Sequence, residues 1–153
     1  AVEERVTVSK ALFACYRSLA EFLAVKGGIG MDIRRAYLED DRDWLTSIAE
    51  EQIPVCLEEL EQYHDFREKI WFHECKPNGY ETIDIRQGGL HARLVSAQKR
   101  ILAYLDGEIT EIPELLEERL PYKPSAPEGL QKPFNMNNWC NIVTAGNMGT
   151  GTI

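Results

Sequence analysis

The sequence predicts an all-α protein: a helical bundle of about three to five helices, followed by a long, mostly irregular C-terminal tail. Through most of the first 122 residues, apolar residues recur every three or four positions, which is typical of helices that bury one face. After Tyr122 the composition changes to Pro, Gly and Asn, the residues of turns and irregular chain. We therefore expect a single domain, with a bundle over 1–122 and an extended tail over 123–153 that packs on it.

The first predicted helix begins near Val8 and continues to about Tyr37. Its apolar stripe has alternating spacings of four and three: Val8, Leu12, Cys15, Leu19 and Phe22. The run KGGIG at 26–30 weakens this helix, because a glycine inside a helix costs about 1 kcal/mol relative to alanine. The stripe nevertheless keeps its phase through Ile29 and Ile33. We expect a kinked but continuous helix, whose glycines mark the close approach of a neighbouring backbone.

An acidic break, LEDDRD, precedes the second predicted helix, and either Asp40 or Asp41 is suited to be its N-cap. Its first apolar residues are Trp44, Leu45 and Ile48. Pro54 interrupts this helix, either as the first turn of a new helix or as a kink. The stripe beyond Pro54 consists of Cys56, Leu60, Tyr63 and Ile70. Pro77 and Gly79 then end the helix.

The connector that follows, ECKPNGYETIDIRQGGLHAR over 74–93, mixes a proline and three glycines with charged and aromatic residues. The next predicted helix carries the stripe Leu90, Leu94, Ala97, Ile101 and Leu105. It ends at Gly107, and Pro113 begins a short helical segment, PELLEERL. A plain linker needs no such composition, so we expect the connector either to make a demanding turn or to be a docking surface.

Charge and composition exclude several classes of function. The chain has a net charge of −8, which disfavours nucleic acid and anionic membrane surfaces as partners. No apolar run approaches the roughly 18 residues that span a bilayer, and the N-terminus lacks the apolar segment of a signal peptide. The cysteines have no C-x-x-C spacing and are expected to be free thiols in a reducing, cytoplasmic setting. They are Cys15, Cys56, Cys75 and Cys140.

The sequence offers no arrangement of side chains for catalysis, cofactor binding or metal binding. The paired glutamates at 50–51, 58–59 and 117–118 point about 100° apart on helices, so their carboxylates do not converge as those of a glycosidase do. No nucleophile motif of the G-x-S-x-G type occurs. The histidines and one nearby cysteine fit no metal-ligand spacing. These residues are His64, His73, Cys75 and His91. We therefore expect no catalytic residue, no cofactor and no metal site.

Two hypotheses remain for the connector. The first is a docking surface, because aromatic residues and arginine are enriched in the cores of protein interfaces. Its candidate residues are Trp71, Lys76, Tyr80, Asp84, Arg86, Gly88, Gly89 and Arg93. The second is a stand-alone helical binding module that holds an anionic small ligand where Arg86 lies beside Gly88 and Gly89 at a helix start, because free backbone N–H groups there favour negative charge. The competing interpretation of the same residues is that Asp84 caps the helix and Arg86 forms a salt bridge.

The connector also resembles a known motif. WFHECKPNGYETIDIRQGGLHARL is similar to the pattern W-x-x-E-x-K-P-x-G-[FY]-E-x-x-D-I-R-x-G-G-L-x-x-R in the helical C-terminal region of a bacterial branch of glycoside hydrolase family 20, the exo-β-N-acetylhexosaminidases. The matching positions are Trp71, Glu74, Lys76, Pro77, Gly79, Tyr80, Glu81, Asp84, Ile85, Arg86, Gly88, Gly89, Leu90 and Arg93. Upstream, the chain is similar to a second segment of the family, K-x-x-L-G-x-x-L-R-x-A-Y. Its matching residues are Lys26, Gly30, Arg34, Ala36 and Tyr37, and Ile29 stands where leucine is usual.

The resemblance, which spans nearly the whole chain, implies a role inside a larger enzyme. Family 20 enzymes cleave terminal β-linked N-acetylhexosamines by a substrate-assisted mechanism, with an Asp–Glu pair on a (β/α)8 barrel. Such a barrel needs roughly 250 residues with alternating strands and helices, so no catalytic residue is carried over to this chain. The implied partner is the (β/α)8 catalytic domain of the same protein. The implied role is to brace that barrel and to support subunit contacts in a possible homodimer, without activity of its own.

Overall fold

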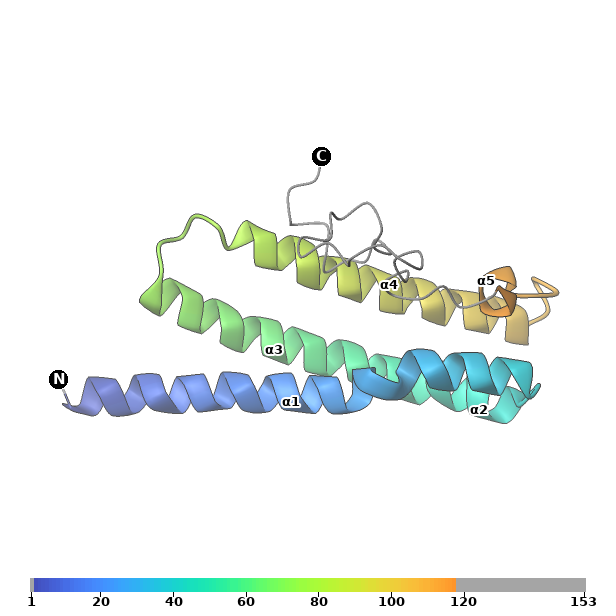
Figure 1. Ribbon diagram of the computed structural model, residues 1–153, viewed down its shortest axis with the longest axis horizontal. Helices are drawn as coiled ribbons and strands as arrows, with labels where there is room; N and C mark the ends of the chain where they lie inside the picture. The colour runs from blue at the N-terminus through green and yellow to red at the C-terminus, as the bar shows by residue number, and fades with distance from the viewer. Residues whose placement is uncertain (1, 118–153) are drawn as a thin grey trace, which may run out of the picture.

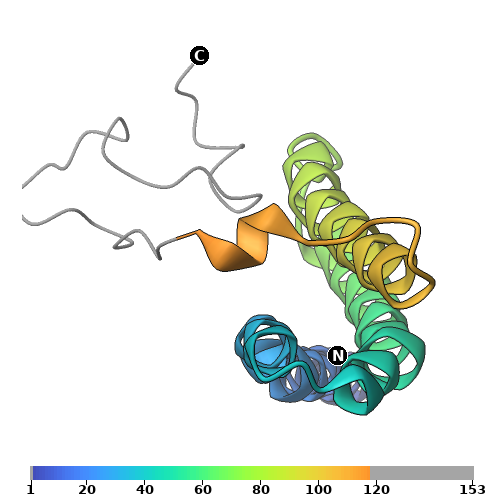
Figure 2. The same cartoon turned by 90° about the vertical axis from the view of Figure 1, so that its right-hand side faces the viewer.

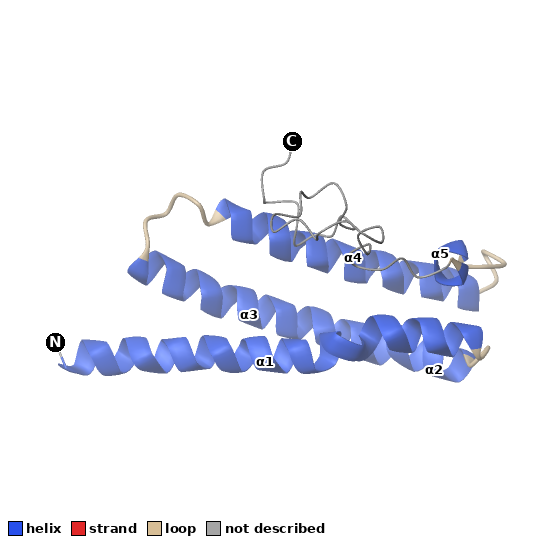
Figure 3. Ribbon diagram, in the orientation of Figure 1, coloured by secondary structure: helices blue, strands red, loops and turns tan. Residues whose placement is uncertain are grey.

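The computed structural model describes residues 2–117, and every regular element in that range is helical (Figure 3). The elements in chain order are α1 (Val2–Leu38), α2 (Arg42–Ser47), the π-helical turn η1 (Ile48–Gln52), α3 (Ile53–Glu74), α4 (Glu81–Leu105) and α5 (Pro113–Leu116). The three long helices run side by side, with α3 between α1 and α4 (Figure 1). An end view places α1 and α4 on different sides of α3 (Figure 2). The predicted all-α bundle is confirmed for this part of the chain, and the predicted tail over 123–153 lies outside the described residues.

Helix α1 is continuous through the glycines at 26–30, as the phase of its apolar residues predicts, and it bends in its second half (Figure 1). It begins at Val2 rather than near Val8. The expected close approach of a neighbouring backbone is wrong for the described part of the chain. A Cβ atom built at Gly27 or Gly30 meets nothing within 4 Å. Within the described residues, Gly27 and Gly30 therefore weaken the helix without a steric reason for their presence.

The turn between α1 and α2 is made by two aspartates with different roles. Asp40 has a φ of 53°, a left-handed conformation that aspartate tolerates better than most residues. Asp41 is the N-cap of α2, because its side chain accepts a hydrogen bond of 2.9 Å from the backbone N–H of Trp44. Of the two predicted N-caps, Asp41 is therefore the correct one.

Pro54 does not kink the second helix but begins α3 behind a π-helical turn. The N–H of Ile53 donates to the carbonyl of Ile48, five residues earlier, so the carbonyl of Ala49 would need the N–H of residue 54. Proline has no N–H, and this leaves the carbonyl of the fully buried Ala49 without a helical partner. The side chain of Gln98 on α4 fills this place and donates from Nε2 at 2.7 Å.

The core lies where α1, α2 and α3 meet and extends to α4. It consists of Phe22, Ile29, Ile33, Ala36, Leu45, Ile48, Ala49, Ile53, Cys56, Leu60, Leu94 and Ile101. Cys15, Cys56 and Cys75 are free, as predicted, and burial raises the pKa of the Cys15 and Cys56 thiols. None of the helices described is long and apolar enough to cross a bilayer.

Replacing Gln98 with methionine tests the bond to the Ala49 carbonyl. We expect Gln98→Met to lower the free energy of unfolding by about 1–3 kcal/mol, because it leaves a buried carbonyl without a donor. Urea unfolding measures this change. The control is Gln62→Met at an exposed position of α3, where a change of less than about 0.5 kcal/mol is expected. Equal effects of the two substitutions would contradict the assigned role of Gln98.

Candidate functional site

The connector between α3 and α4 is closed by Trp71. The indole Nε1 of Trp71 donates to the carbonyl of Lys76 at 2.9 Å, which holds the chain against the last turn of α3. Gly79 has a φ of 100°, the left-handed conformation that glycine adopts most readily, and a Cβ atom there would lie 3.5 Å from the Trp71 ring. Both the tight turn and the aromatic residue are therefore required by the fold of the connector itself.

Helix α4 begins at Glu81, earlier than the sequence predicts. The Glu81 side chain accepts a hydrogen bond of 2.7 Å from the N–H of Gly79, and Thr82 Oγ1 donates to the Gly79 carbonyl at 2.7 Å. These bonds start the helix before the two glycines, so Gly88 and Gly89 lie inside it. The hypothesis of an anion site at a Gly88–Gly89 helix start is therefore wrong, because that helix start does not exist.

Asp84 is not the cap of α4. It lies in the first turn of the helix, where a negative charge interacts favourably with the helix dipole, and its Oδ1 is 2.8 Å from Nε2 of His64 on α3. Arg86 forms no ion pair with the side chains described for residues 10–117, and its buried Nε has no hydrogen-bond partner among them. The salt bridge expected for Arg86 is therefore not formed in the described part of the chain.

Tyr80 joins the connector to α3 through aromatic contacts. Its side chain is 5% exposed, and its ring centroid lies 5.8 Å from that of Trp71 and 5.3 Å from that of Phe72. The hydroxyl donates to the His64 carbonyl at 3.4 Å. Burial, and then the negative charge of Asp84, raise the pKa of Tyr80 to about 12.

The structure brings only part of the predicted site together. Trp71, Tyr80 and Asp84 are connected through Tyr80 and His64, and Lys76 is exposed at the connector. The remaining candidates are distributed around α4: Arg86, Gly88, Gly89 and Arg93. Arg86 follows Asp84 by two residues, and Arg93 follows His91 by two residues. Each arginine therefore lies about 160° around α4 from the residue it follows.

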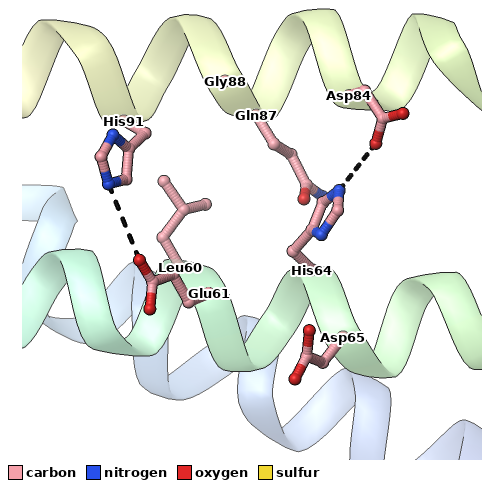
Figure 4. A pocket seen from close by; sticks show the side chains of 8 residues that line it. All are labelled: Leu60, Glu61, His64, Asp65, Asp84, Gln87, Gly88 and His91. Carbon is pink, nitrogen blue, oxygen red and sulfur yellow. Dashed lines mark hydrogen bonds and ion pairs between the residues drawn. The ribbon is translucent and has the colours of Figure 1, made fainter.

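A groove of about 440 Å³ lies between α3 and α4 (Figure 4). Its lining residues are Leu60, Glu61, His64, Asp65, Asp84, Gln87, Gly88 and His91. At one end His64 bonds to Asp84, and at the other Nε2 of His91 lies 3.7 Å from Oε1 of Glu61. Both pairs link α3 to α4, and the carboxylate of Asp65 points away from α4 (Figure 4).

Gln87 lies between the two histidine–carboxylate pairs. Its side chain points from α4 toward α3 and is 8% exposed, and its Oε1 has no hydrogen-bond partner (Figure 4). A buried amide oxygen without a donor costs about 1–3 kcal/mol, so it is an uncommon feature in a folded domain. The groove is thus lined by hydrogen-bond acceptors, one of which is unpaired.

The sequence did not reveal Glu61, Gln87 or the pairing of the histidines. The spacing of the histidines fits no metal-ligand pattern and indicates structural or surface roles without naming their partners, and residues 2–117 contain no cluster of three or more His, Cys, Asp or Glu side chains that could hold a metal. The available signal was the spacing of Asp84, Gln87 and His91, which places them on one face of a helix. That spacing indicates a shared groove only when α3 is known to pack opposite this face of α4.

The raised pKa of Tyr80 predicts how stability changes at alkaline pH. The folded-state pKa of about 12 exceeds the usual value of about 10, so the neutral phenol is favoured by folding. The resulting stability is complete below pH of about 10 and is lost as the pH rises through about 12. Phenolate absorbance and urea unfolding across this range measure both effects. Tyr80→Phe should remove one late-titrating phenol and reduce the alkaline loss of stability, while the phenol of Tyr63, whose pKa burial also raises, remains. An unchanged profile would contradict the assignment.

Comparison with known proteins places the chain in a family. Residues 1–134 match the family model described as the Glycoside Hydrolase 20C C-terminal domain. No curated protein matches the chain significantly. The matched residues include α1, α3, α4, the connector and the groove. The chain therefore belongs to the Glycoside Hydrolase 20C C-terminal domain family, and it is a domain of a glycoside hydrolase.

Proposed function

We propose that this chain is the non-catalytic C-terminal domain of a β-N-acetylhexosaminidase, and that it packs against the (β/α)8 catalytic domain of the same protein. In that position it braces the barrel and supports contacts between the subunits of a homodimer. The whole enzyme hydrolyses terminal β-linked N-acetylhexosamines. The family match supports a domain of a glycoside hydrolase, and a large apolar face on α1 supports a docking role.

This apolar face, the α1 stripe, follows one side of the first helix. Its large members are between 49% and 75% exposed: Phe13, Tyr16, Leu23, Met31 and Leu38. Their spacings of three, seven, eight and seven residues keep them on one face of a helix, with Ala20 and Gly27 between them. The opposite face of α1 packs on α3, so this helix is apolar on two sides.

Such a stripe favours a covering partner. Large apolar side chains that are exposed along one face of a helix are typical of interaction sites. Near its C-terminal end the stripe borders a hollow of about 340 Å³, lined by Met31, Arg34, Arg35, Leu38 and Glu39. The open space beside Gly27 and Gly30 would let a partner approach the α1 backbone closely.

The absence of activity from the domain alone is tested directly. The full-length enzyme and this 153-residue chain are each assayed on an aryl N-acetyl-β-glucosaminide. We expect turnover only by the full-length enzyme. Turnover by the chain alone would contradict the proposal that the catalytic pair lies elsewhere.

Charge introduced into the α1 stripe should disrupt docking. We expect Leu23→Glu in the full-length enzyme to lower the melting temperature and the dimer fraction, because a carboxylate would be buried in an apolar contact. The matched control is Val55→Glu, a residue of α3 with 45% exposure against 49% for Leu23. Differential scanning calorimetry and light scattering measure the two effects. If both variants behave like the parent enzyme, the stripe is not the docking face.

A substitution at Gly27 of α1 should distinguish the stability of the domain from its docking in the full-length enzyme. We expect Gly27→Ala to raise the free energy of unfolding of the isolated chain by up to about 1 kcal/mol, because the helix gains a better residue and the new methyl group meets nothing within 4 Å. In the full-length enzyme the same methyl group should weaken the contact and cancel the gain. Urea unfolding of both proteins measures the difference. An equal gain in both would show that no partner approaches Gly27.

A further inference from the structure

We propose that the groove between α3 and α4 binds the guanidinium group of an arginine side chain presented by the surface that docks on this domain. The inference rests on the proposed function for the source of the arginine. It concerns a different part of the domain from the α1 stripe, namely the groove lined by Glu61, His64, Asp84, Gln87 and His91.

The charge of the groove selects a positively charged group. Asp84 and Glu61 supply a carboxylate at each end, and no lysine or arginine lines the groove. Each carboxylate has one histidine partner in the described residues and retains further acceptor sites, since an ionised carboxylate offers about four. An anion would be repelled by both.

The side chain of Gln87 provides a hydrogen-bond acceptor that has no donor among the described residues. Its Oε1 is buried and unpaired, and it lies between the two carboxylates (Figure 4). No side chain in residues 2–117 donates to it. A group that donates to Gln87 and to a carboxylate at the same time needs several N–H groups in one plane. Guanidinium has five such donors in a fixed fork, whereas a lysine ammonium is a compact point charge.

The shape of the groove agrees with an arginine side chain. Leu60 contributes an apolar surface for the methylene groups. Gly88 lines the groove without a side chain, and a Cβ built there meets nothing within 4 Å, so a partner backbone can approach α4 at this point. A glycine inside a helix costs about 1 kcal/mol relative to alanine, and the residues that the structure describes give no steric reason for Gly88.

The first test uses small probes and the 153-residue chain. N-acetyl-arginine amide is titrated while NMR follows the side-chain amide of Gln87 and the rings of His64 and His91. The matched probe is N-acetyl-citrulline amide, which has the same shape but a neutral urea. We expect saturable shifts at these residues and about tenfold tighter binding of the arginine probe. Equal binding of both probes, shifts confined to other residues, or preferred binding of N-acetylglucosamine or inorganic phosphate would each overturn the proposal.

Variants then assign the binding to the groove. Asp84→Asn should weaken the arginine probe about tenfold, because it removes a charged acceptor. The control is Asp106→Asn at the C-terminal end of α4, an exposed carboxylate that does not line the groove, so its loss should leave binding unchanged. Gln87→Met removes the unpaired oxygen, so it should keep or raise the melting temperature while it loses the probe. It therefore decides the question even if Asp84→Asn unfolds the chain. Full affinity in Gln87→Met, or an equal loss in Asp106→Asn, would refute the site.

The outcome is separate from that of the proposed function. If the arginine probe fails to bind while Leu23→Glu still disrupts the full-length enzyme, the groove inference is wrong and the docking proposal stands. If the probe binds in the groove while Leu23→Glu has no effect, the domain has a guanidinium site and the α1 stripe is not its docking face.

Discussion

The rest of the bundle depends on one hydrogen bond, which joins Gln98 on α4 to the buried carbonyl oxygen of Ala49. Pro54 removes the donor that would have satisfied this buried carbonyl, and the π-helical turn moves the N–H of Ile53 to Ile48. Gln98 supplies the missing donor from α4. Because an unpaired buried carbonyl is costly, this bond fixes the position of α4 along the axis of α3. The groove residues of α4 lie opposite those of α3 only at that axial position.

The connector fixes the other end of the same two helices. Trp71 closes the chain onto α3 through the Lys76 carbonyl, and Tyr80 packs between Trp71, Phe72 and His64. The composition that first suggests a docking surface is thus used largely by the turn itself. The acceptors of the groove lie one helical turn further along α4, where Asp84 contacts His64 and the buried Oε1 of Gln87 has no partner among the described residues. A fixed connector and a fixed helix height together hold the groove open without a bound partner.

The helices and their faces could be predicted from the sequence, because the three-and-four spacing of apolar residues and the capping aspartate Asp41 are local signals. The start of α4 was mispredicted, because the glycine pair suggested a boundary and the bonds of Glu81 and Thr82 to Gly79 outweighed it. The groove could not be predicted from the sequence for another reason. It consists of pairs between residues twenty or more apart, such as His64 and Asp84, whose meeting depends on the height of α4 along α3.

A first helix that is apolar on two sides also affects how the protein can be handled. If the whole enzyme covers this face as proposed, the covering surface is nearby at high effective concentration and shields the second face soon after the chain folds. A copy expressed alone meets other copies first, and self-association or precipitation competes with its native state. The isolated chain is therefore expected to stay monomeric only in dilute solution, and its tendency to self-associate should rise with concentration.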